Sequence, residues 1–488
     1  MYRPTIGLEI HAELKTRTKM FCDSANNSDE TRPNVNVCPI CMAHPGTLPV
    51  INREAMRHIL CIGTAVDGKL ADFSEFDRKS YFYPDIPKGY QISQYEHPLV
   101  SGGVLSGVAI TRVHLEEDTA RSVHVGGLPA MPAHAGQAGK SLVDFNRAGI
   151  PLMELVTEPV IRDAETAGRF ARELQLLLRT LGASEANMEK GEMRIEANVS
   201  VAKHEALSTK SQTNLKMGTK VEVKNLNSFR SVERAITFEI NRQIALIEGG
   251  GKVMQETRGW NDTKQETFHQ RFKEGSADYR YFPEPDLPKL FLSEIPELSR
   301  EAIRASLPEL PWDKRNRLLK DYELKEEATE LFLQDVELGK FFEKVVSGRT
   351  PDFARLAANY ITTDLIALLS AGGGKVFSDA DTFTRLMDMV VSNKISSRGA
   401  KDILAEMYRS GGGPETIAEE HGIIQMHDTE ILRNAVKGVL EEETKAVEEY
   451  RAGKEAALQY LIGKSMKATK SSGNPAMLKN IIIEELKG

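Results

Sequence analysis

Polar and apolar residues alternate along short segments of the first half of the chain, and this alternation predicts β-strands with one wet face and one buried face. The pattern is clearest at residues 7–11 (GLEIH) and 221–224 (VEVK). A side-chain period of two places Glu9 and His11 on one face of the first strand. Further strands are predicted over residues 104–115 and 219–223.

Helical spacing appears between these strands. Apolar residues recur near helical spacing within residues 164–181, which predicts an amphipathic helix there. A second helix is predicted over 232–248, ended by the three glycines that follow it. The stretch 121–140, rich in Gly, Pro, Ala and His, predicts an excursion between strands. This mixture favours an α+β fold over regular βαβ repetition.

The second half of the chain is predicted to be helical. The run 306–311 (SLPELP) marks a helix boundary, because a residue that precedes proline avoids the α region. Gly411–Gly413 and Pro414 break the chain, and Gly372–Gly374 offer a competing break. We therefore expect a mixed α/β cradle domain, a helical domain and a small all-α tail, over residues 1–293, 294–408 and 409–488.

Composition indicates an ordinary soluble globular protein. Charged residues make up 27% and apolar residues 41% of the 488 residues. No apolar run is long enough for a membrane helix, no signal peptide is visible, and four cysteines fit a reducing cytoplasm. The net charge of −7 does not by itself suggest nucleic acid, although the last 28 residues carry five Lys and two Glu, a local charge of +3.

Four acidic segments suggest the chemistry. Besides the two strands named first, they are residues 114–118 (HLEED) and 193–198 (MRIEAN). Several carboxylates and an imidazole lining one cleft would repel each other unless a cation lay among them. Oxygen ligands with an occasional histidine suit Mg²⁺ on a nucleotide phosphate. The alternative is a set of solvated strand faces.

Longer motifs bring in a family resemblance. They are 79–94 (KSYFYPDIPKGYQISQ), 144–154 (DFNRAGIPLME), 223–230 (VKNLNSFR), 278–286 (DYRYFPEPD) and 463–470 (GKSMKATK). With these motifs, in order over essentially the whole chain, the sequence resembles the B subunits of the tRNA-dependent amidotransferases, the GatB/GatE family of the GatCAB enzymes.

The resemblance implies a carbon–nitrogen ligase that uses ATP and Mg²⁺. Glutamate esterified to tRNA(Gln), or aspartate on tRNA(Asn), would be phosphorylated on its side-chain carboxylate and then amidated. Ammonia would come from glutamine in a partner A subunit, and a small C subunit would complete a heterotrimer without membrane attachment. No Walker-type or Gly-x-Gly-x-x-Gly phosphate loop is present. The alternatives are a tRNA-binding scaffold without chemistry and a stand-alone ATP-dependent amino-acid ligase.

The same resemblance suggests roles for individual residues. The expected catalytic set is Glu9, His11, Glu116, Glu117, Glu196 and Glu222. Of these, Mg²⁺ would be held by Glu9, His11, Glu117 and Glu222. The cations expected to contact ATP or substrate are Arg194, Lys224, Arg230, Lys79 and Lys88. Glu196 stands where the family usually has Asp, which puts its role as a direct ligand in doubt. Tyr81, Tyr83 and Tyr90 are expected to pack a strand–turn unit.

Cys38 and Cys41 have the spacing of a zinc knuckle. Some members of the family carry four cysteines here, but the upstream pair is Cys22 and Ser24 in this chain. Cys22, Cys38 and Cys41 could bind Zn²⁺ with His44 in place of the missing thiolate, but we favour a degenerate, metal-free loop. Cys61 lies in an apolar run and is expected in the core.

Lys464, Lys467 and Lys470 recur every three residues near the C-terminus and form a partial basic stripe on a helix. The resemblance places a tRNA-binding domain here, so contact with tRNA phosphates is expected. The alternative is a solvated helix face.

Overall fold

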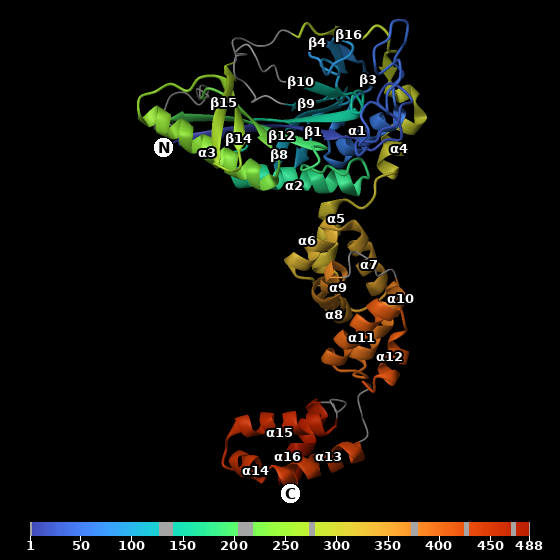
Figure 1. Ribbon diagram of the computed structural model, residues 1–488, viewed down its shortest axis with the longest axis vertical. Coiled ribbons are helices and arrows are strands. Elements are labelled where there is room, and N and C mark those ends of the chain that lie inside the picture. The colour runs from blue at the N-terminus through green and yellow to red at the C-terminus, as the bar shows by residue number, and fades with distance from the viewer. Residues whose placement is uncertain are drawn as a thin grey trace. The chain divides into compact units, whose positions relative to one another are not determined.

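The computed structural model describes residues 2–125, 140–203, 218–272, 279–371, 379–423, 429–469 and 475–487. The chain divides into two compact units, Met1–Pro311 and Trp312–Gly488 (Figure 1). The first unit mixes strands and helices, and the second contains helices only among its described residues. The fold class is therefore α+β, as predicted.

A ten-stranded sheet forms the centre of the first unit. Its strands are β1 (Tyr2–Glu13), β2 (Lys69–Leu70), β6 (Val100–Ser101), β7 (Val104–Leu105), β8 (Val108–Glu117), β11 (Pro151–Thr157), β12 (Met193–Lys203), β13 (Val221–Leu226), β14 (Glu256–Asn261) and β15 (Glu266–Phe272). The order is β15-β14-β13-β12-β1-β11-β8-β6-β2, with β7 paired to β8. The strand pairs are antiparallel except β13 with β14, the parallel pair of a β13–α3–β14 crossover. Regular βαβ repetition, which the sequence does not favour, is thus not seen among the described strands of this sheet.

Two long helices, α2 (Ala164–Thr180) and α3 (Phe229–Glu248), run along the same side of this sheet (Figure 1). Both helices were predicted from the sequence. The second begins three residues earlier than the apolar pattern indicates, because the Ser228 hydroxyl accepts a hydrogen bond from the Ser231 amide and caps the helix. Leu8 and Ile10 of β1 are buried within the core. Glu9 and His11, which alternate with them, therefore point to the opposite face.

Smaller elements complete the first unit. They are α1 (Arg53–Ala65), β3 (Phe73–Ser74), β4 (Asp77–Ser80), β5 (Tyr90–Ser93), β9 (Arg121–Val125), β10 (Lys140–Asp144), β16 (Phe282–Pro283), β17 (Leu290–Phe291), η1 (Leu292–Glu294), η2 (Pro296–Leu298) and α4 (Arg300–Ala305). Strands β16, β4 and β5 form a small sheet in that order, so the hairpin β4–β5 lies beside a segment about 200 residues away in sequence.

Two sequence predictions are corrected here. Residues 104–115 are not one strand: Ser106 and Gly107 turn the chain with φ values of 49° and 78°, and separate β7 from β8. The ends of the predicted excursion 121–140 are strands, since β9 pairs with β10. Residues 126–139 lie outside the described part of the chain.

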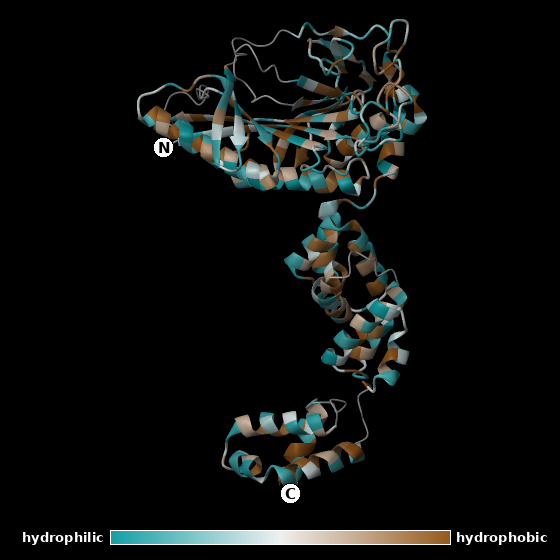
Figure 2. Ribbon diagram, viewed as in Figure 1, coloured by the Kyte–Doolittle hydropathy of each residue, from teal (hydrophilic) through white to brown (hydrophobic). Residues whose placement is uncertain are grey.

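The second unit consists of helices with two separate apolar clusters. The helices are α5 (Pro311–Lys320), α6 (Glu326–Gln334), α7 (Val336–Val346), α8 (Pro351–Tyr360), the π-helical turn η3 (Ile361–Leu365), α9 (Ile366–Ala371), α10 (Ala380–Val391), α11 (Ser397–Ser410), α12 (Pro414–Glu420), α13 (Thr429–Glu442), α14 (Thr444–Arg451), α15 (Glu455–Ala468) and α16 (Pro475–Lys487). One cluster lies within residues 318–418 and the other within 432–482. The helices carry both hydrophobic and hydrophilic residues along their length (Figure 2).

Both helix boundaries predicted in described residues are confirmed. Helix α4 ends at Ala305, just before the run 306–311, and helix α5 begins at Pro311. Helix α11 ends at Ser410, and Gly411 follows it in the left-handed conformation with φ 76°. The competing break at 372–374 lies outside the described residues. Among the helices that are described, none combines the length and apolarity of a membrane span.

Candidate active site

A row of polar side chains crosses five adjacent strands on the open face of the large sheet. The register places Glu9 opposite Glu196, and His11 opposite Glu154. It also places Glu154 opposite His114. Directly opposed residues of antiparallel strands point to the same face. The strand register, and not proximity along the chain, therefore brings these groups together.

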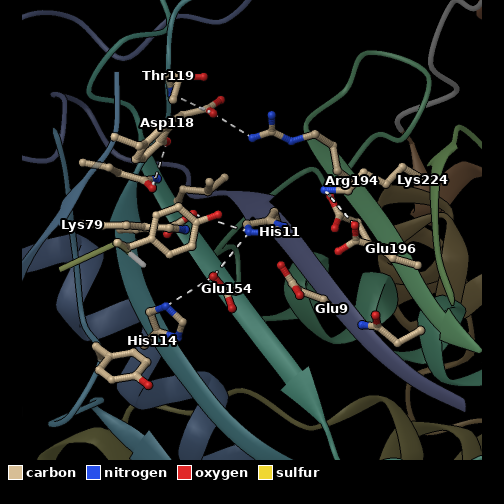
Figure 3. A pocket seen from close by; sticks show the side chains of 18 of the residues that line it. Glu9, His11, Lys79, His114, Asp118, Thr119, Glu154, Arg194, Glu196 and Lys224 are labelled. Carbon is tan, nitrogen blue, oxygen red and sulfur yellow. Dashed lines mark hydrogen bonds and ion pairs between the residues drawn. The ribbon is translucent and has the colours of Figure 1, made fainter. Parts of the chain in front are cut away.

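These side chains line a cleft of about 820 Å³ (Figure 3). The residues expected at the site that line it are Glu9, His11, Lys79, Glu116, Arg194, Glu196, Glu222 and Lys224. The sequence reasoning missed further ionisable residues of the cleft, and His114 and Glu154 lie at its centre. A signal was present for both: His114 alternates with Glu116, and Glu154 is the one charged residue of the buried strand 151–157 (PLMELVT).

The centre of the cleft is a set of carboxylates and imidazoles. The Nε2 atom of His11 lies 3.5 Å from a carboxylate oxygen of Glu116 and 3.5 Å from one of Glu154. The Nε2 atom of His114 lies 3.4 Å from Glu154. Two overlapping triads share Glu154, and within each one the ligand atoms lie within 4.8 Å of one another: Glu9, His11, Glu154 and His114, Glu116, Glu154.

The charge balance of this centre favours a cation. Burial and the neighbouring carboxylates Glu154 and Glu196 raise the pKa of Glu9 above its ordinary value. Burial opposes protonation of His11, but its hydrogen bond with Glu154 and the charge of Glu116 outweigh that and raise the pKa of His11 to about 9. Without a metal ion, a protonated His11 imidazole would therefore supply positive charge to these carboxylates.

Oxygen donors at the site fit a hard metal ion. The side-chain oxygen of Asn198, which also lines the cleft, is buried and has no hydrogen-bond partner within the described residues. An amide oxygen, carboxylates and one imidazole are ligands that Mg²⁺ accepts, and Mg²⁺ keeps several waters of its own. The donor set therefore fits Mg²⁺.

Cations line the same cleft. The Lys224 ammonium lies 2.9 Å from Glu196 and 3.9 Å from Glu222. The Arg194 guanidinium lies 2.7 Å from Asp118. Burial lowers the pKa of Lys79, but the charges of Glu116 and Glu154 outweigh burial and raise it above its ordinary value. Charged lysines and an arginine beside carboxylates can bind an anion and a cation together, as a metal–phosphate complex requires.

Three of the expected residues lie elsewhere. Glu117 points to the other face of β8, because it alternates with Glu116. Its carboxylate accepts hydrogen bonds from the Lys88 ammonium at 2.5 Å and from the Ile92 amide at 2.9 Å. Glu117 and Lys88 line a separate pocket of about 250 Å³. Arg230 is exposed in the first turn of α3 and does not line the cleft.

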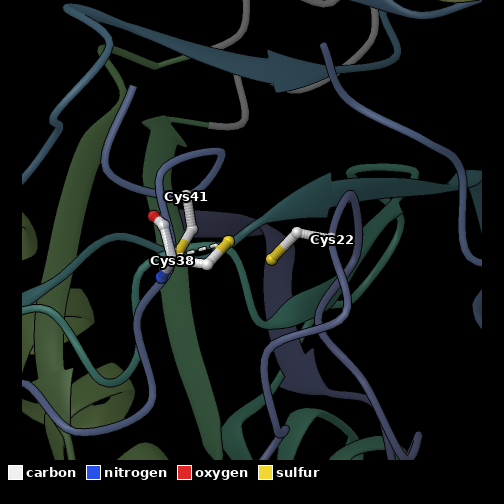
Figure 4. Close-up of side chains that lie close together, drawn as sticks. All are labelled: Cys22, Cys38 and Cys41. Atoms are coloured by element: carbon white, nitrogen blue, oxygen red, sulfur yellow. Dashed lines mark hydrogen bonds between the residues drawn. The ribbon is translucent and has the colours of Figure 1, made fainter. Parts of the chain in front are cut away.

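The structure brings Cys22, Cys38 and Cys41 together (Figure 4), with their sulfurs within 4.8 Å of one another. The Ser24 hydroxyl and the buried Lys19 ammonium each lie 3.8 Å from the Cys41 sulfur. A hydrogen bond from Cys22, together with the charge of Lys19, lowers the pKa of Cys41 to about 4 despite its burial. Three thiols resemble part of a zinc site, but the fourth neighbour is a hydroxyl and the nearby cation is a lysine.

The remaining residues predicted from the sequence are Cys61 and the three tail lysines. Cys61 is buried on α1, which confirms its expected place in the core. Lys464 of α15 forms an ion pair of 2.6 Å with Glu443, and Lys467 on the same helix is exposed. Lys470 lies outside the described residues.

Comparisons with known proteins show the family to which the chain belongs. The sequence profile of the GatB/GatE catalytic domain matches residues 4–295, and that of the GatB domain matches residues 340–486. The B subunit of the aspartyl/glutamyl-tRNA(Asn/Gln) amidotransferase of Thermomicrobium roseum is 43% identical over 497 residues, which cover 99% of each chain. The protein of the same name from Moorella thermoacetica is 42% identical over 99% of this chain and 100% of its own. The chain belongs to the GatB/GatE family.

Proposed function

We propose that the chain is the B subunit of an aminoacyl-tRNA amidotransferase. It would activate the side-chain carboxylate of Glu-tRNA(Gln), Asp-tRNA(Asn) or both with ATP, and amidate it. The observation that supports this most strongly is the cleft in which carboxylates and imidazoles meet lysines and an arginine, in a chain that matches family members over its full length. The B-subunit name of these relatives implies an assembly of several subunits.

ATP is needed because a carboxylate reacts poorly with ammonia, since its oxygen is a bad leaving group. Phosphorylation converts that oxygen into a good leaving group, and ammonia then displaces phosphate to form the amide. Mg²⁺, when bound, would neutralise charge on the phosphates. We propose that Glu9, His11 and Glu154 hold it, with Glu116 as the neighbouring ligand.

The remaining charged residues of the cleft would bind the anionic groups. Lys79, Lys224 and Arg194 are placed to contact the transferring phosphate or the substrate carboxylate. Glu196 and Glu222 hold Lys224 in position through their ion pairs. The longer side chain of Glu196, in place of the usual Asp, thus suits a positioning role.

Glu117 and Lys88 would support the cleft from outside it. Glu117 of β8 accepts a hydrogen bond from the Ile92 amide of β5 and pairs with Lys88. These contacts would stabilise the packing of β5 against β8 beside the cleft. A contact of Arg230 with phosphate remains a prediction. We also retain the three-domain division at residues 293 and 408, with a tRNA-binding tail that uses Lys464, Lys467 and Lys470.

We propose that an A subunit supplies ammonia from glutamine and that a small C subunit completes the enzyme. None of the four cysteines, all of which are described, is in a disulfide, so a reducing compartment, the cytoplasm, is the proposed location. The three-cysteine loop would function without zinc, with Lys19 as its cation. Metal analysis of the purified chain tests this: zinc bound at one equivalent and retained through dialysis contradicts it, whereas Ser24→Cys should bind zinc more tightly.

The test of function is ATP cleavage by the chain assembled with its A and C subunits in the presence of Mg²⁺. Uncharged tRNA(Gln), Glu-tRNA(Gln) and free glutamate are compared. Turnover that requires Glu-tRNA(Gln) and yields Gln-tRNA(Gln) supports the proposal. Turnover on free glutamate would indicate a small-molecule ligase, and tight tRNA binding without turnover would indicate a scaffold.

A further inference from the structure

Five tyrosines form a continuous series of ring contacts at the cleft. Successive ring centroids lie 6.1, 5.9, 6.0 and 4.2 Å apart in the order Tyr83, Tyr81, Tyr279, Tyr281 and Tyr95. We call this set the tyrosine row. Its members come from three segments, after β4, after β5 and before β16. All except Tyr83 line the cleft.

Packing alone does not account for the tyrosine row. Its two ends are open to solvent, with Tyr83 59% and Tyr95 51% exposed. Beside Tyr83, Phe82 is 88% exposed, and one side of its ring lies so close to Gly89 that an added Cβ there would be 3.0 Å away. Exposed aromatic side chains gathered at the rim of a cleft mark a binding surface.

The row is held in a fixed arrangement. The Ser80 amide donates a hydrogen bond of 2.9 Å to the Tyr279 carbonyl, and the Tyr81 hydroxyl donates one of 3.3 Å to the Gln91 side chain. The Lys79 ammonium lies 5.0 Å from the centre of the Tyr279 ring. Burial raises the pKa of Tyr281 to about 12, so its hydroxyl is a neutral donor that does not repel phosphate.

We propose that the tyrosine row is a stacking platform for the unpaired bases at the 3′ end of the substrate tRNA. This inference rests on the proposed function, in which the amino acid is esterified to the terminal ribose. When its side chain reaches Glu9 and His11, the last nucleotides must cross the rim of the same cleft. Unpaired bases stack on aromatic side chains whatever their sequence.

Two features favour tRNA over the adenine of ATP as the occupant. A single adenine covers one ring, whereas the row presents several rings in succession and extends to the exposed Tyr83 at the outer end. Lys79, next to the rings, adds a positive charge that suits a phosphate backbone. A strand of nucleotides that enters the cleft uses both features.

The experiment places the fluorescent base 2-aminopurine at the 3′-terminal position of the tRNA, because stacking quenches its emission. The assembled enzyme with the unmodified chain should quench it on binding, without any need for turnover. Tyr83→Leu and Tyr95→Leu should each reduce the quenching and raise the KM for Glu-tRNA(Gln) about tenfold, within the range that loss of one base–aromatic stack gives. Tyr83→Phe and Tyr95→Phe keep the ring and should retain the quenching.

Phe291→Leu is the matched control, since Phe291 is an aromatic residue of the same unit, 50% exposed and outside the cleft. It should leave quenching and KM unchanged. Absence of quenching with the unmodified chain, or equal quenching in the Leu and Phe variants, overturns the platform. A rise in the KM for ATP alone also overturns it and assigns the rings to adenine. Quenching that depends on the tyrosine rings, in an assembly that never forms Gln-tRNA, supports the platform while the proposed function fails.

Discussion

The two units of the chain differ in whether they bury charged side chains. In the first unit, carboxylates, lysine and histidine are buried, among them His114, Glu116 and Glu154 in the cleft. In the described residues of the second unit, the only buried polar side chains are Thr329, Ser465 and Thr469, and none carries a charge. Burial of a charge is costly unless it is paired. In the first unit buried charges have partners, both in the cleft and outside it, as at Glu256 with Arg258. The described part of the second unit contains no buried charged side chain.

Architecture explains why the site lies in the sheet. Each strand of an antiparallel sheet can place one residue beside its neighbour's on a chosen face, so five strands can assemble one cluster. In the second unit, the apolar faces of the helices pack into the two hydrophobic clusters. Charged side chains of this unit form exposed or partly exposed ion pairs, such as Arg433 with Glu484. Buried groups with perturbed pKa values, such as His11, Lys79 and Glu154, accordingly line the cleft.

The largest expected effect on stability is in the helical unit, where Phe342→Ala should remove apolar packing. Phe342 is fully buried and stacks on Phe332 with ring centroids 4.4 Å apart. Loss of the ring should cost about 3–5 kcal/mol in the free energy of unfolding. Urea unfolding followed by circular dichroism measures this. ATP turnover per folded molecule should stay within about twofold, and a specific loss of turnover in folded protein would contradict the division of roles.

Glu154→Gln tests the role of the buried charges in the first unit. Removing the charge that the two candidate metal-ligand triads share should lower kcat for Gln-tRNA formation at least about a hundredfold. The chain should remain folded, because glutamine fills the same volume. Glu256→Gln is the control, since Glu256 is a buried carboxylate that is paired with Arg258 outside the cleft. Equal losses of kcat in both variants would show that burial, and not the cleft, matters.

The charge on His11 makes stability depend on pH. The pKa of His11 is about 9 in the folded chain, against an ordinary value of 6.5, when no metal is present. A raised folded-state pKa gives stabilisation that is complete below pH 6.5 and is lost as pH rises through 9. In Mg²⁺-free buffer, His11→Asn should therefore destabilise the chain by at most about 3 kcal/mol at pH 6, and much less at pH 10.

The measurement is the difference in unfolding free energy between the two chains at each pH. The same comparison at the exposed His44 is the control. A difference for His11 that grows as pH rises would contradict the paired imidazolium.

The smallest effect is expected at Lys467 in the tail. Lys467→Glu should raise the KM for aminoacyl-tRNA about two- to fivefold at low salt and leave kcat unchanged, because a phosphate contact positions tRNA without taking part in chemistry. Steady-state kinetics at two salt concentrations measures it. Lys445→Glu, the same charge change at an exposed position of α14, should have a smaller effect. Equal effects would indicate net charge and not a specific contact.

The sequence was most successful where local pattern decides the structure. Helix 164–181 and the end of α3 at Gly249 follow from apolar spacing and glycine placement. The prediction of a single strand over residues 104–115 is wrong, because a turn at Ser106 and Gly107 divides this segment into the hairpin β7–β8. The sequence reasoning also placed Glu116 and Glu117 together in the site, although strand alternation sends them to opposite faces.

By itself, the sequence determined the family, the α+β class and most of the cleft's charged residues, because motifs, spacing and residue chemistry are properties of the chain. Only the tertiary structure decided that Glu154 joins His11 and His114, and that five tyrosines from three segments form one series of ring contacts at the cleft. These contacts depend on strand register between segments far apart in sequence, and register is set by which faces the whole domain buries.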